Sequence, residues 1–163
     1  MPFIYFISRE FFRGLITCFG RIEVIGVEDV PTSGGVILAP NHVSYFDPPV
    51  VGCGLRTRHV RFMAKKELCR TRFQHWWMNA VGSFAVNRGA ADRGAIKKAI
   101  NYLAKGEVLA IFPEGTRSPD GTLQKAELGI GMVALKARVP VVPVAVIGTE
   151  IALPPHGRPK RHP

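Results

Sequence analysis

The 163-residue sequence lacks three features that would each assign a protein to a class. No uninterrupted apolar run reaches the roughly 18 residues that a membrane-spanning helix needs. The three cysteines (Cys18, Cys53 and Cys69) form no CxxC pair, and their odd number argues against a disulfide framework. The five histidines show no HExxH or Cys/His metal spacing. We therefore expect a protein of a reducing compartment that holds no metal ion.

Positive charge is in excess within an otherwise ordinary globular composition. Hydrophobic residues make up 47% and charged residues 21% of the chain, which at this length favours one domain with one core. The formal net charge is +10, and a basic surface indicates an anionic partner: nucleic acid, an anionic membrane or a phosphorylated small molecule. No helix-turn-helix, RNA-recognition or zinc pattern is visible, so we expect no nucleic-acid partner.

The first 20 residues are aromatic-rich and have the pattern of an amphipathic helix. One side of the helical wheel carries Arg9, Glu10, Arg13 and Thr17, and the other carries Ile4, Ile7, Phe11, Phe12, Leu15, Cys18 and Phe19. This pattern predicts a helix that lies in a membrane interface; a helix that packs on its own domain is the alternative. Trp76 and Trp77 are expected to anchor another helix in the core, with one of them facing a membrane as the alternative.

Beyond residue 20, short apolar strands alternate with helices. We expect strands at residues 21–30, 36–39, 60–64, 83–86, 108–112 and 139–148. Helices are expected at 71–81, 92–105 and 127–137, and from Asp47, with Asp47 as N-cap and Pro48 as first helical residue. The alternation predicts an α/β fold, with a mainly parallel sheet covered by helices on both faces. We assign residues 1–20 to the N-terminal helix, 21–150 to the α/β domain and 151–163 to a basic, Pro-rich, disordered tail.

Polar clusters follow several of the predicted strands, at the carboxyl edge where such sheets bind ligands. Lys65, Arg88 and Arg117 would together place three cations there and form a phosphate site, although a solvated charge is the alternative at each position. His42 and Asp47 lie five residues apart at the same edge. Such a histidine can take a proton from a hydroxyl while the carboxylate fixes its tautomer. The alternative is structural: Asp47 caps a helix and His42 is a loop residue.

The segment FPEGTRS, residues 112–118, ends a predicted strand in a turn. Arg117 offers a planar fork suited to phosphate, Thr116 adds a hydroxyl, and Gly115 permits unusual backbone geometry. Glu114 is expected to orient Arg117 or to accept from a substrate hydroxyl; a Glu–Arg surface pair is the alternative. Ser44 belongs to no GxSxG elbow and is expected to form local hydrogen bonds.

Four blocks in this order make the chain resemble the lysophosphatidic acid acyltransferases, the 1-acyl-sn-glycerol-3-phosphate acyltransferase family with its phospholipid/glycerol acyltransferase domain. They are NHVSYFD (41–47), which matches NHxxxxD, GSFAVNR (82–88), FPEGTRS (112–118) and VPVVPV (139–144). AKKEL (64–68) also resembles the family's segment between the first two blocks. The resemblance covers residues 21–149.

The resemblance implies a glycerol-phosphate acyltransferase-like fold and a role in phospholipid biosynthesis. An acyl group from acyl-CoA or acyl-carrier protein would pass to a lysophospholipid hydroxyl, chiefly that of 1-acyl-sn-glycerol-3-phosphate, without an acyl-enzyme. His42 would be the general base and Asp47 its partner. The acceptor's glycerol phosphate would be bound by Arg88, Glu114, Gly115, Thr116 and Arg117, with Lys65 as a further candidate. The fourth block would shape the sheet and the acyl pocket, and no metal or prosthetic group is implied.

The expected partners are therefore an anionic membrane surface, a lysophospholipid and the acyl donor, and the expected location is monotopic, on the cytoplasmic face of a membrane. Two departures leave alternatives open. Glu127, in AELG (126–129), stands where many members carry the lysine of Phe-Lys-x-Gly, which bears on acceptor affinity or choice. The chain also stops soon after the fourth block. A catalytically silent, truncated membrane- or lipid-binding paralogue, or an acyltransferase for another acceptor, would fit both departures.

Overall fold

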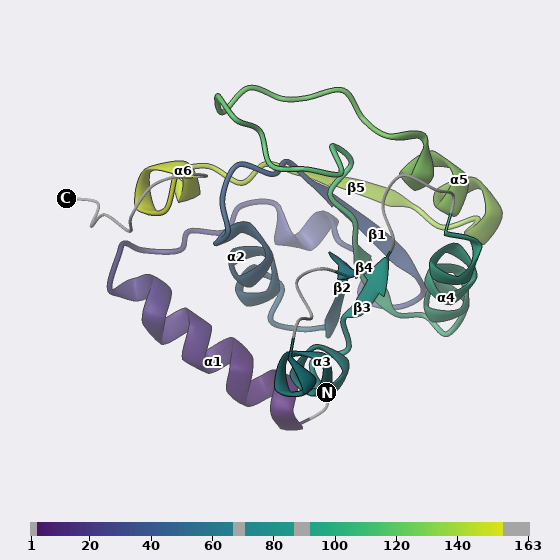
Figure 1. Cartoon of the computed structure of the whole chain (residues 1–163), viewed down its shortest axis with the longest axis horizontal. Helices are drawn as coiled ribbons and strands as arrows, with labels where there is room; N and C mark the ends of the chain where they lie inside the picture. The colour runs from purple at the N-terminus through teal and green to yellow at the C-terminus, as the bar shows by residue number, and fades with distance from the viewer. Residues whose placement is uncertain (1–2, 67–70, 87–91, 155–163) are drawn as a thin grey trace.

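A computed structural model of the chain describes residues 3–66, 71–86 and 92–154, and these form a parallel sheet with helices on both faces (Figure 1). The described elements, in chain order, are α1 (Phe3–Thr17), η1 (Val27–Asp29), β1 (Val36–Pro40), α2 (Asp47–Gly54), β2 (Val60–Lys65), α3 (Arg72–Ala80), β3 (Phe84–Val86), α4 (Arg93–Ala104), β4 (Val108–Ala110), α5 (Leu128–Ala137), β5 (Val141–Val144) and α6 (Thr149–Ala152). The predicted α/β fold with a parallel sheet is confirmed.

The five strands of the sheet follow the order β3-β2-β4-β1-β5, and every described pair is parallel. β1 lies between β4 and β5, with Val36 opposite Val108 and Ile37 opposite Val141. Pro143 lies within β5, an edge strand of this sheet, where its missing N–H removes no ladder bond that a central strand would need. Because the strands are parallel, the loops that follow them all leave from one edge of the sheet.

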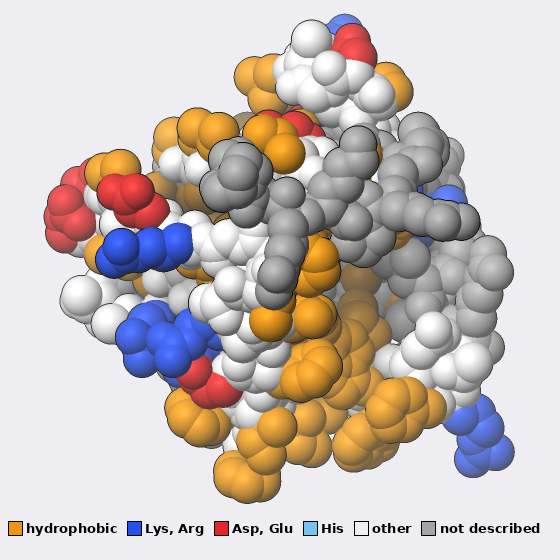
Figure 2. Space-filling view, turned by 90° about the vertical axis from the view of Figure 1, so that its left-hand side faces the viewer, with side chains coloured by type: hydrophobic (Ala, Val, Ile, Leu, Met, Phe, Trp, Pro, Cys, Tyr) orange, Lys and Arg blue, Asp and Glu red, His pale blue; other side chains and the backbone are white. Residues whose placement is uncertain are grey.

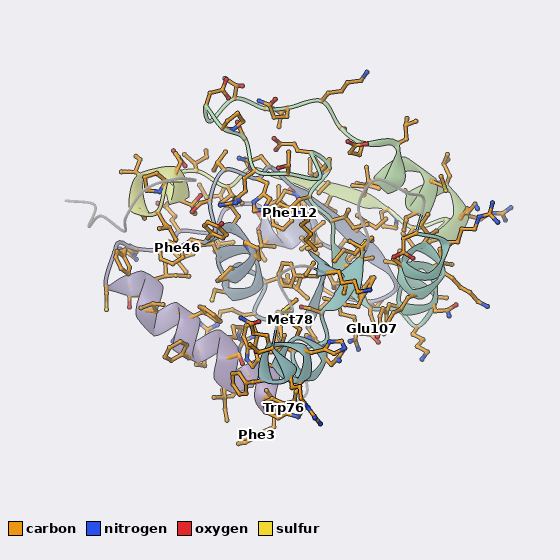
Figure 3. The ribbon with its side chains drawn as sticks, viewed as in Figure 1. Phe3, Phe46, Trp76, Met78, Glu107 and Phe112 are labelled. Carbon is orange, nitrogen blue, oxygen red and sulfur yellow. The ribbon has the colours of Figure 1, made fainter. Side chains whose placement is uncertain are left out.

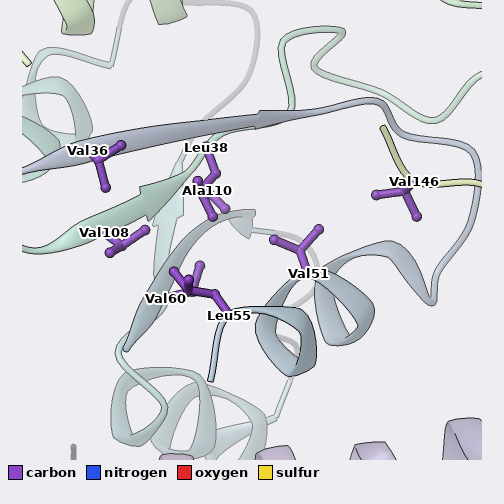
Figure 4. Packing of buried hydrophobic residues seen from close by; sticks show 8 residues of the cluster. All are labelled: Val36, Leu38, Val51, Leu55, Val60, Val108, Ala110 and Val146. Atoms are coloured by element: carbon purple, nitrogen blue, oxygen red, sulfur yellow. The ribbon is translucent and has the colours of Figure 1, made fainter. Parts of the chain in front are cut away.

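Successive residues of β1 pack into two separate cores because side chains alternate across a strand. Val36 and Leu38 pack with Val51 of α2 on one face (Figure 4). Ile37 packs on the other face, against Leu103 of α4 and Val133 of α5. Helices thus cover both faces of the sheet, which explains why β1 and β4 are apolar throughout rather than alternating.

α1 packs on α2, and Arg9 is the charged residue of α1 that becomes buried. Arg9 is only 8% exposed, and its Nη1 donates to the carbonyl of Arg56 at 3.0 Å. Tyr5 is buried too, with its hydroxyl 3.5 Å from the carbonyl of Gly52. Five large apolar side chains of α1 remain exposed: Phe3, Phe6, Ile7, Phe11 and Leu15. None of the described helices is long and apolar enough to cross a membrane.

Local sequence signals set the ends of two helices. Thr71 and Gln74 form a reciprocal capping box at the start of α3. The Asp92 carboxylate accepts from Ala95 N at 2.9 Å at the start of α4. α4 ends just before Gly106, whose φ of 78° suits a residue without a side chain.

Some expectations about individual elements are wrong. Residues 21–30 form no strand: Gly26 adopts a φ of 72°, the segment ends in η1, and Ile25 is 88% exposed. Trp76 does not anchor α3 in the core, because it is 55% exposed. The strand expected at residues 139–148 is shorter in the structure, where β5 spans Val141–Val144. The division into helix, domain and tail stays a prediction; residues 151 and 152 end α6, and residues 155–163 lie outside the described ranges.

Candidate active site

Two loops meet at the carboxyl edge of the sheet, one after β1 and one after β4. The backbone N–H of His42 donates to Glu114 Oε1 at 2.8 Å, and the N–H of Ser118 donates to the carbonyl of His42 at 2.7 Å. Glu114 Oε2 accepts from Gln124 N at 3.1 Å, and the side chain is buried. Glu114 therefore holds the loops together, and the surface-pair interpretation of this residue is wrong.

His42 and Asp47 form a close pair within the first loop. His42 Nδ1 lies 2.8 Å from Asp47 Oδ2, and the His42 side chain is 15% exposed while that of Asp47 is fully buried. Because an ionised carboxylate only accepts, Nδ1 carries the hydrogen and Nε2 presents its lone pair. Within the described residues Nε2 has no hydrogen-bond partner. The ring of Phe112 packs on the imidazole, with centroids 4.2 Å apart.

Asp47 faces back toward the loop instead of capping its helix. It is the first residue of α2, Phe46 occupies the N-cap position, and no side chain caps the helix, so the predicted cap is wrong. Asp47 Oδ2 also accepts from the N–H groups of Val43 and Ser44, each at 2.7 Å. Oδ1 accepts from the Thr149 hydroxyl at 2.6 Å. These donors satisfy a buried charge that would otherwise be costly to desolvate.

Contacts with the C-terminal part of the described chain hold the His42 loop in place. The Asn41 amide donates to the carbonyl of Val146 at 3.0 Å and accepts from Val146 N at 2.7 Å. Ser44 Oγ accepts from Phe46 N, the local bond expected for it, and also donates to the carbonyl of Leu153 at 2.7 Å. Thr149 and the structural use of Asn41 were missed from the sequence. The only signal for Thr149 is a hydroxyl after the last apolar strand, outside all four blocks.

The predicted phosphate-binding residues are only partly described. The Arg117 guanidinium carbon lies 3.5 Å from the ring centre of Tyr45, which belongs to the His42 loop. Gly115, with a φ of 65°, and Lys65 at the end of β2 line the same cavity as His42. Thr116, between Gly115 and Arg117 in the turn, is exposed. Arg88 lies outside the described residues.

A cavity of about 420 Å³ opens beside His42. Its lining comes from α1, α2, β2, α3, β3, the loop after β4 and α5, and is mostly apolar; Phe112 and Met78 both belong to it (Figure 3). Among the described lining residues none comes from Val139–Val144. The fourth block contributes β5 to the sheet, and its role in an acyl pocket stays a prediction. The site thus places a histidine beside a space suited to an apolar chain.

The described residues contain no group of three or more His, Cys, Asp or Glu side chains that could hold a metal ion. The Asp47 carboxylate is instead buried, accepts several hydrogen bonds and holds the imidazole of His42. Chemically, the arrangement suits proton transfer from a hydroxyl at Nε2.

The acyltransferase family model matches residues 21–147 of the chain. The 1-acyl-sn-glycerol-3-phosphate acyltransferase of Bacillus subtilis is 30% identical over 129 residues, which are 79% of this chain and 64% of that protein. The chloroplastic 1-acyl-sn-glycerol-3-phosphate acyltransferase LPAT1 of Arabidopsis thaliana is 30% identical over 156 residues, or 93% of this chain and 43% of that protein. The chain therefore spans between 43% and 64% of the length of these two relatives.

A solved structure is similar to the fold as a whole. The 1-acyl-sn-glycerophosphate (LPA) acyltransferase PlsC from Thermotoga maritima matches with a TM-score of 0.79 and 29% sequence identity. The match covers 94% of this chain and 61% of that protein. The similarity therefore extends beyond the four blocks to nearly the whole chain.

Proposed function

This chain belongs to the acyltransferase family, and we propose that it transfers a fatty acyl group from acyl-CoA or acyl-carrier protein to the free hydroxyl of a lysophospholipid. The names of its relatives favour 1-acyl-sn-glycerol-3-phosphate as acceptor, which gives phosphatidic acid as product. The observation that carries the proposal is the His42–Asp47 pair, with 2.8 Å between Nδ1 and Oδ2, at one end of a largely apolar cavity of about 420 Å³.

The proposed reaction needs no covalent enzyme intermediate. The acceptor hydroxyl gives its proton to His42 Nε2 while its oxygen attacks the carbonyl carbon of the thioester. A carbon–oxygen bond forms, and collapse of the tetrahedral intermediate breaks the carbon–sulfur bond. The proton then passes from His42 to the departing thiolate, which leaves as a free thiol. Asp47 stabilises the imidazolium between these two steps, and its buried hydrogen bonds keep the ring oriented.

The polar end of the cavity would hold the acceptor's phosphate. Arg117 presents a planar guanidinium whose orientation is limited by its stacking on Tyr45. Lys65 lines the cavity itself, and Gly115 and Thr116 belong to the turn beside it. Glu114 acts indirectly in this scheme, because its oxygens accept from backbone N–H groups that set the position of His42.

The apolar part of the cavity would hold an acyl chain. Its lining includes Phe12 of α1, Phe62 of β2, Trp77 of α3 and Val133 of α5. Each methylene moved from water into such a lining contributes about 0.8 kcal/mol, so a long chain binds here without polar contacts.

A membrane is the proposed source of the acceptor. Exposed apolar side chains of α1 and α3 form a surface that we call the outer apolar face: Phe3, Phe6, Ile7, Phe11, Leu15, Phe73 and Trp76. The two helices contact each other, since Trp77 Nε1 donates to Ser8 Oγ at 3.2 Å. Hydrophobic side chains gather along the lower edge of the molecule in Figure 2, and Phe3 and Trp76 lie at the same end in Figure 3. Exposed apolar area of this kind, together with a net charge of +10, suits monotopic binding to an anionic membrane.

Vesicle co-sedimentation tests the membrane part of the proposal. The double variant Phe11→Ser/Phe73→Ser should bind anionic vesicles several-fold more weakly than the wild type. Ile25→Ser is the matched control, because Ile25 is 88% exposed but lies outside both helices. Equal binding by the double variant and the wild type would refute the assignment of this face.

The catalytic part is tested by thiol release from acyl-CoA in the presence of 1-acyl-sn-glycerol-3-phosphate. His42→Ala should lower turnover by about 10²–10⁴-fold, the usual effect of removing a general base. His75→Ala is the control, since His75 is exposed on α3 and does not line the cavity. Unchanged turnover in His42→Ala contradicts the mechanism. Vesicle binding by the wild type without thiol release from either donor favours the catalytically silent lipid-binding paralogue.

A further inference from the structure

A groove of about 440 Å³ lies between α4 and α5, apart from the cavity beside His42. Its described lining consists of three aliphatic and three cationic side chains: Ile96, Ile100, Met132, Arg93, Lys97 and Lys136. The two isoleucines are half-buried and the three cations are exposed. Neither helix contains an acidic residue, and no described carboxylate forms an ion pair with any of these cations. The groove therefore has an apolar floor and a positively charged rim.

The spacing of the lining residues makes the groove run along both helices. Arg93 and Lys97 are four residues apart on α4, so they lie on one side of that helix, and the two isoleucines have the same spacing. Met132 and Lys136 are four residues apart on α5. At a rise of 1.5 Å per residue, the lining of α4 extends for about 10 Å. This shape suits an amphipathic helix that has an apolar stripe with acidic residues beside it.

The lining suits a protein surface better than a nucleotide. Among the described lining residues there is no aromatic ring to stack on a base, and no hydroxyl or amide side chain to bind its edge. Small-molecule sites usually need such precisely placed groups. Exposed cations on two helices instead complement an extended acidic surface, and complementarity of this kind sets the rate and specificity of protein association.

Only the width of one helix separates the groove from the active-site cavity. Ile130 and Val133 of α5 line that cavity, whereas Met132 and Lys136 of the same helix line the groove. An α-helix with its side chains is about 10 Å across. A thioester on a flexible arm can cross this distance while the protein that carries the arm stays in the groove.

The groove also begins at the edge of the sheet that carries His42. Both α4 and α5 return the chain to the start of the next parallel strand, so both helices begin at the carboxyl edge. The start of α5 is held there, because Glu127 N donates to the carbonyl of Pro113 at 2.8 Å. A flexible arm therefore has a short route around the start of α5 to the candidate base.

Membrane binding as proposed above would leave this groove accessible. The outer apolar face belongs to α1 and α3, and α1 packs on α2, which covers one face of the sheet. α4 and α5 cover the opposite face, and they lie on the other side of the molecule from α1 in Figure 1. The groove would thus stay open to a soluble partner while the outer apolar face contacts the membrane.

We propose that the α4–α5 groove docks the acidic carrier protein that presents the acyl thioester. The docking rests on the proposed function, because it names the partner that delivers the acyl group to that site. Acyl-CoA carries the same thioester but has no protein surface for the groove to bind, so it should react without this contact. The competing explanation is that Arg93, Lys97 and Lys136 are only solvated surface charges.

A comparison of the two donors in the thiol-release assay tests the docking. The value of kcat/KM is measured for a palmitoyl group on the acyl-carrier protein of Bacillus subtilis and on CoA, with 1-acyl-sn-glycerol-3-phosphate as acceptor. In the variant Lys97→Glu/Lys136→Glu like charges would meet, so kcat/KM should fall about tenfold with the carrier protein and stay within about twofold with CoA. Arg56→Glu/Lys105→Glu is the matched control, because it changes the net charge equally at exposed positions outside the groove.

The outcomes separate the docking from the proposed function. No fall with the carrier protein, or an equal fall with both donors, would overturn the docking. Weaker binding of the variant to anionic vesicles, with an unchanged ratio between the donors, would overturn it in favour of a membrane contact. If the wild type releases no thiol from either donor, the proposed function fails, and calorimetry with the thiol form of the carrier protein tests the groove alone. Binding that Lys97→Glu/Lys136→Glu weakens supports the docking, and absent or unchanged binding overturns it.

Discussion

The two edges of the sheet carry similar charged residues but use them in opposite ways. At the amino edge, Arg58 donates to the carbonyls of Pro31 and Gly34, which precede β1, and of Gly106, which precedes β4. At the carboxyl edge, Lys65 and Glu127 line a cavity instead. The first arrangement ties a charged side chain to backbone carbonyls, and the second places charged side chains beside a cavity.

Other charged or titratable side chains at the amino edge also bond to protein groups. Arg61 pairs with Glu107, and its guanidinium carbon lies 4.1 Å from the ring centre of Tyr102. His59 Nε2 donates to the carbonyl of Val81 at 2.8 Å, whereas His42 Nε2 at the other edge faces the cavity side without a described partner. The comparison teaches that a charged residue near a strand end indicates function only when its protein partners leave a reactive atom open.

Asp47→Asn changes the residue with the most hydrogen bonds at the carboxyl edge. Of the substitutions considered, it should have the largest effect on turnover. The amide keeps the volume of the side chain but no longer stabilises an imidazolium at His42. We expect kcat in the thiol-release assay to fall by about 10²–10⁴-fold. Asp29→Asn is the control, since Asp29 is exposed in η1. A kcat within twofold of the wild-type value would remove Asp47 from the mechanism.

Arg58→Met tests the opposite expectation at the amino edge. The variant loses charge-assisted hydrogen bonds to carbonyls that join β1, β2 and β4 at their starts. The free energy of unfolding, measured with urea, should fall by about 1–3 kcal/mol while kcat per folded molecule is unchanged. Arg56→Met controls for the loss of one charge, because the Arg56 residue is exposed. If Arg58→Met keeps the wild-type free energy of unfolding but loses turnover, Arg58 has a role in function and not in stability.

Thr149→Val measures how much the distant hydroxyl contributes to the His42–Asp47 pair. The substitution leaves Asp47 Oδ1 without its 2.6 Å donor in a buried site. If the lost hydrogen bond contributes roughly 1 kcal/mol to holding the His42–Asp47 pair in its reactive orientation, kcat should fall about fivefold. Thr149→Ser should restore the rate, and Thr32→Val, at an exposed position, should not change it. Equal rates for the Val and Ser variants would show that the hydroxyl is dispensable.

The smallest expected effect concerns His59 and pH. Burial lowers the pKa of His59, and the hydrogen bond to the Val81 carbonyl offsets this only in part. Between the lowered pKa and the ordinary value of about 6.5, the unfolded chain binds more protons, so the free energy of unfolding rises with pH in that window. His59→Gln should flatten this part of the profile, just below the ordinary histidine pKa of about 6.5. Superimposable profiles for the two proteins would contradict the prediction.

Much of the fold could be predicted because its strands are short apolar runs, buried on both faces, with clear turn signals between them. Residues 36–39 and 108–110 are examples, and both are central in the sheet. Residues 21–30 have an alternating pattern as well, but alternation does not specify a partner strand, and Gly26 turns the chain away. Trp76 was misassigned for a related reason: a large apolar side chain does not reveal whether its helix faces a core or the outside.

Within the site, spacing alone predicted that His42 and Asp47 could meet, because a five-residue separation across a loop and a helix start allows it. The partners that hold this pair could not be predicted in the same way. Thr149 lies 102 residues from Asp47, and Val146 lies 105 residues from Asn41. No local pattern encodes such contacts, since they arise only when β5 pairs with β1.

By itself, the sequence determined the α/β alternation, the four blocks and the candidate base, because each depends on neighbours within a few residues. Only the tertiary structure decided that Glu114 positions His42, that Asp47 faces the loop, and that α1 buries Arg9. The physical reason is that a polar side chain takes whichever partner the packed chain brings within about 3 Å. Which partner that is depends on the pairing of strands and helices far apart in the sequence.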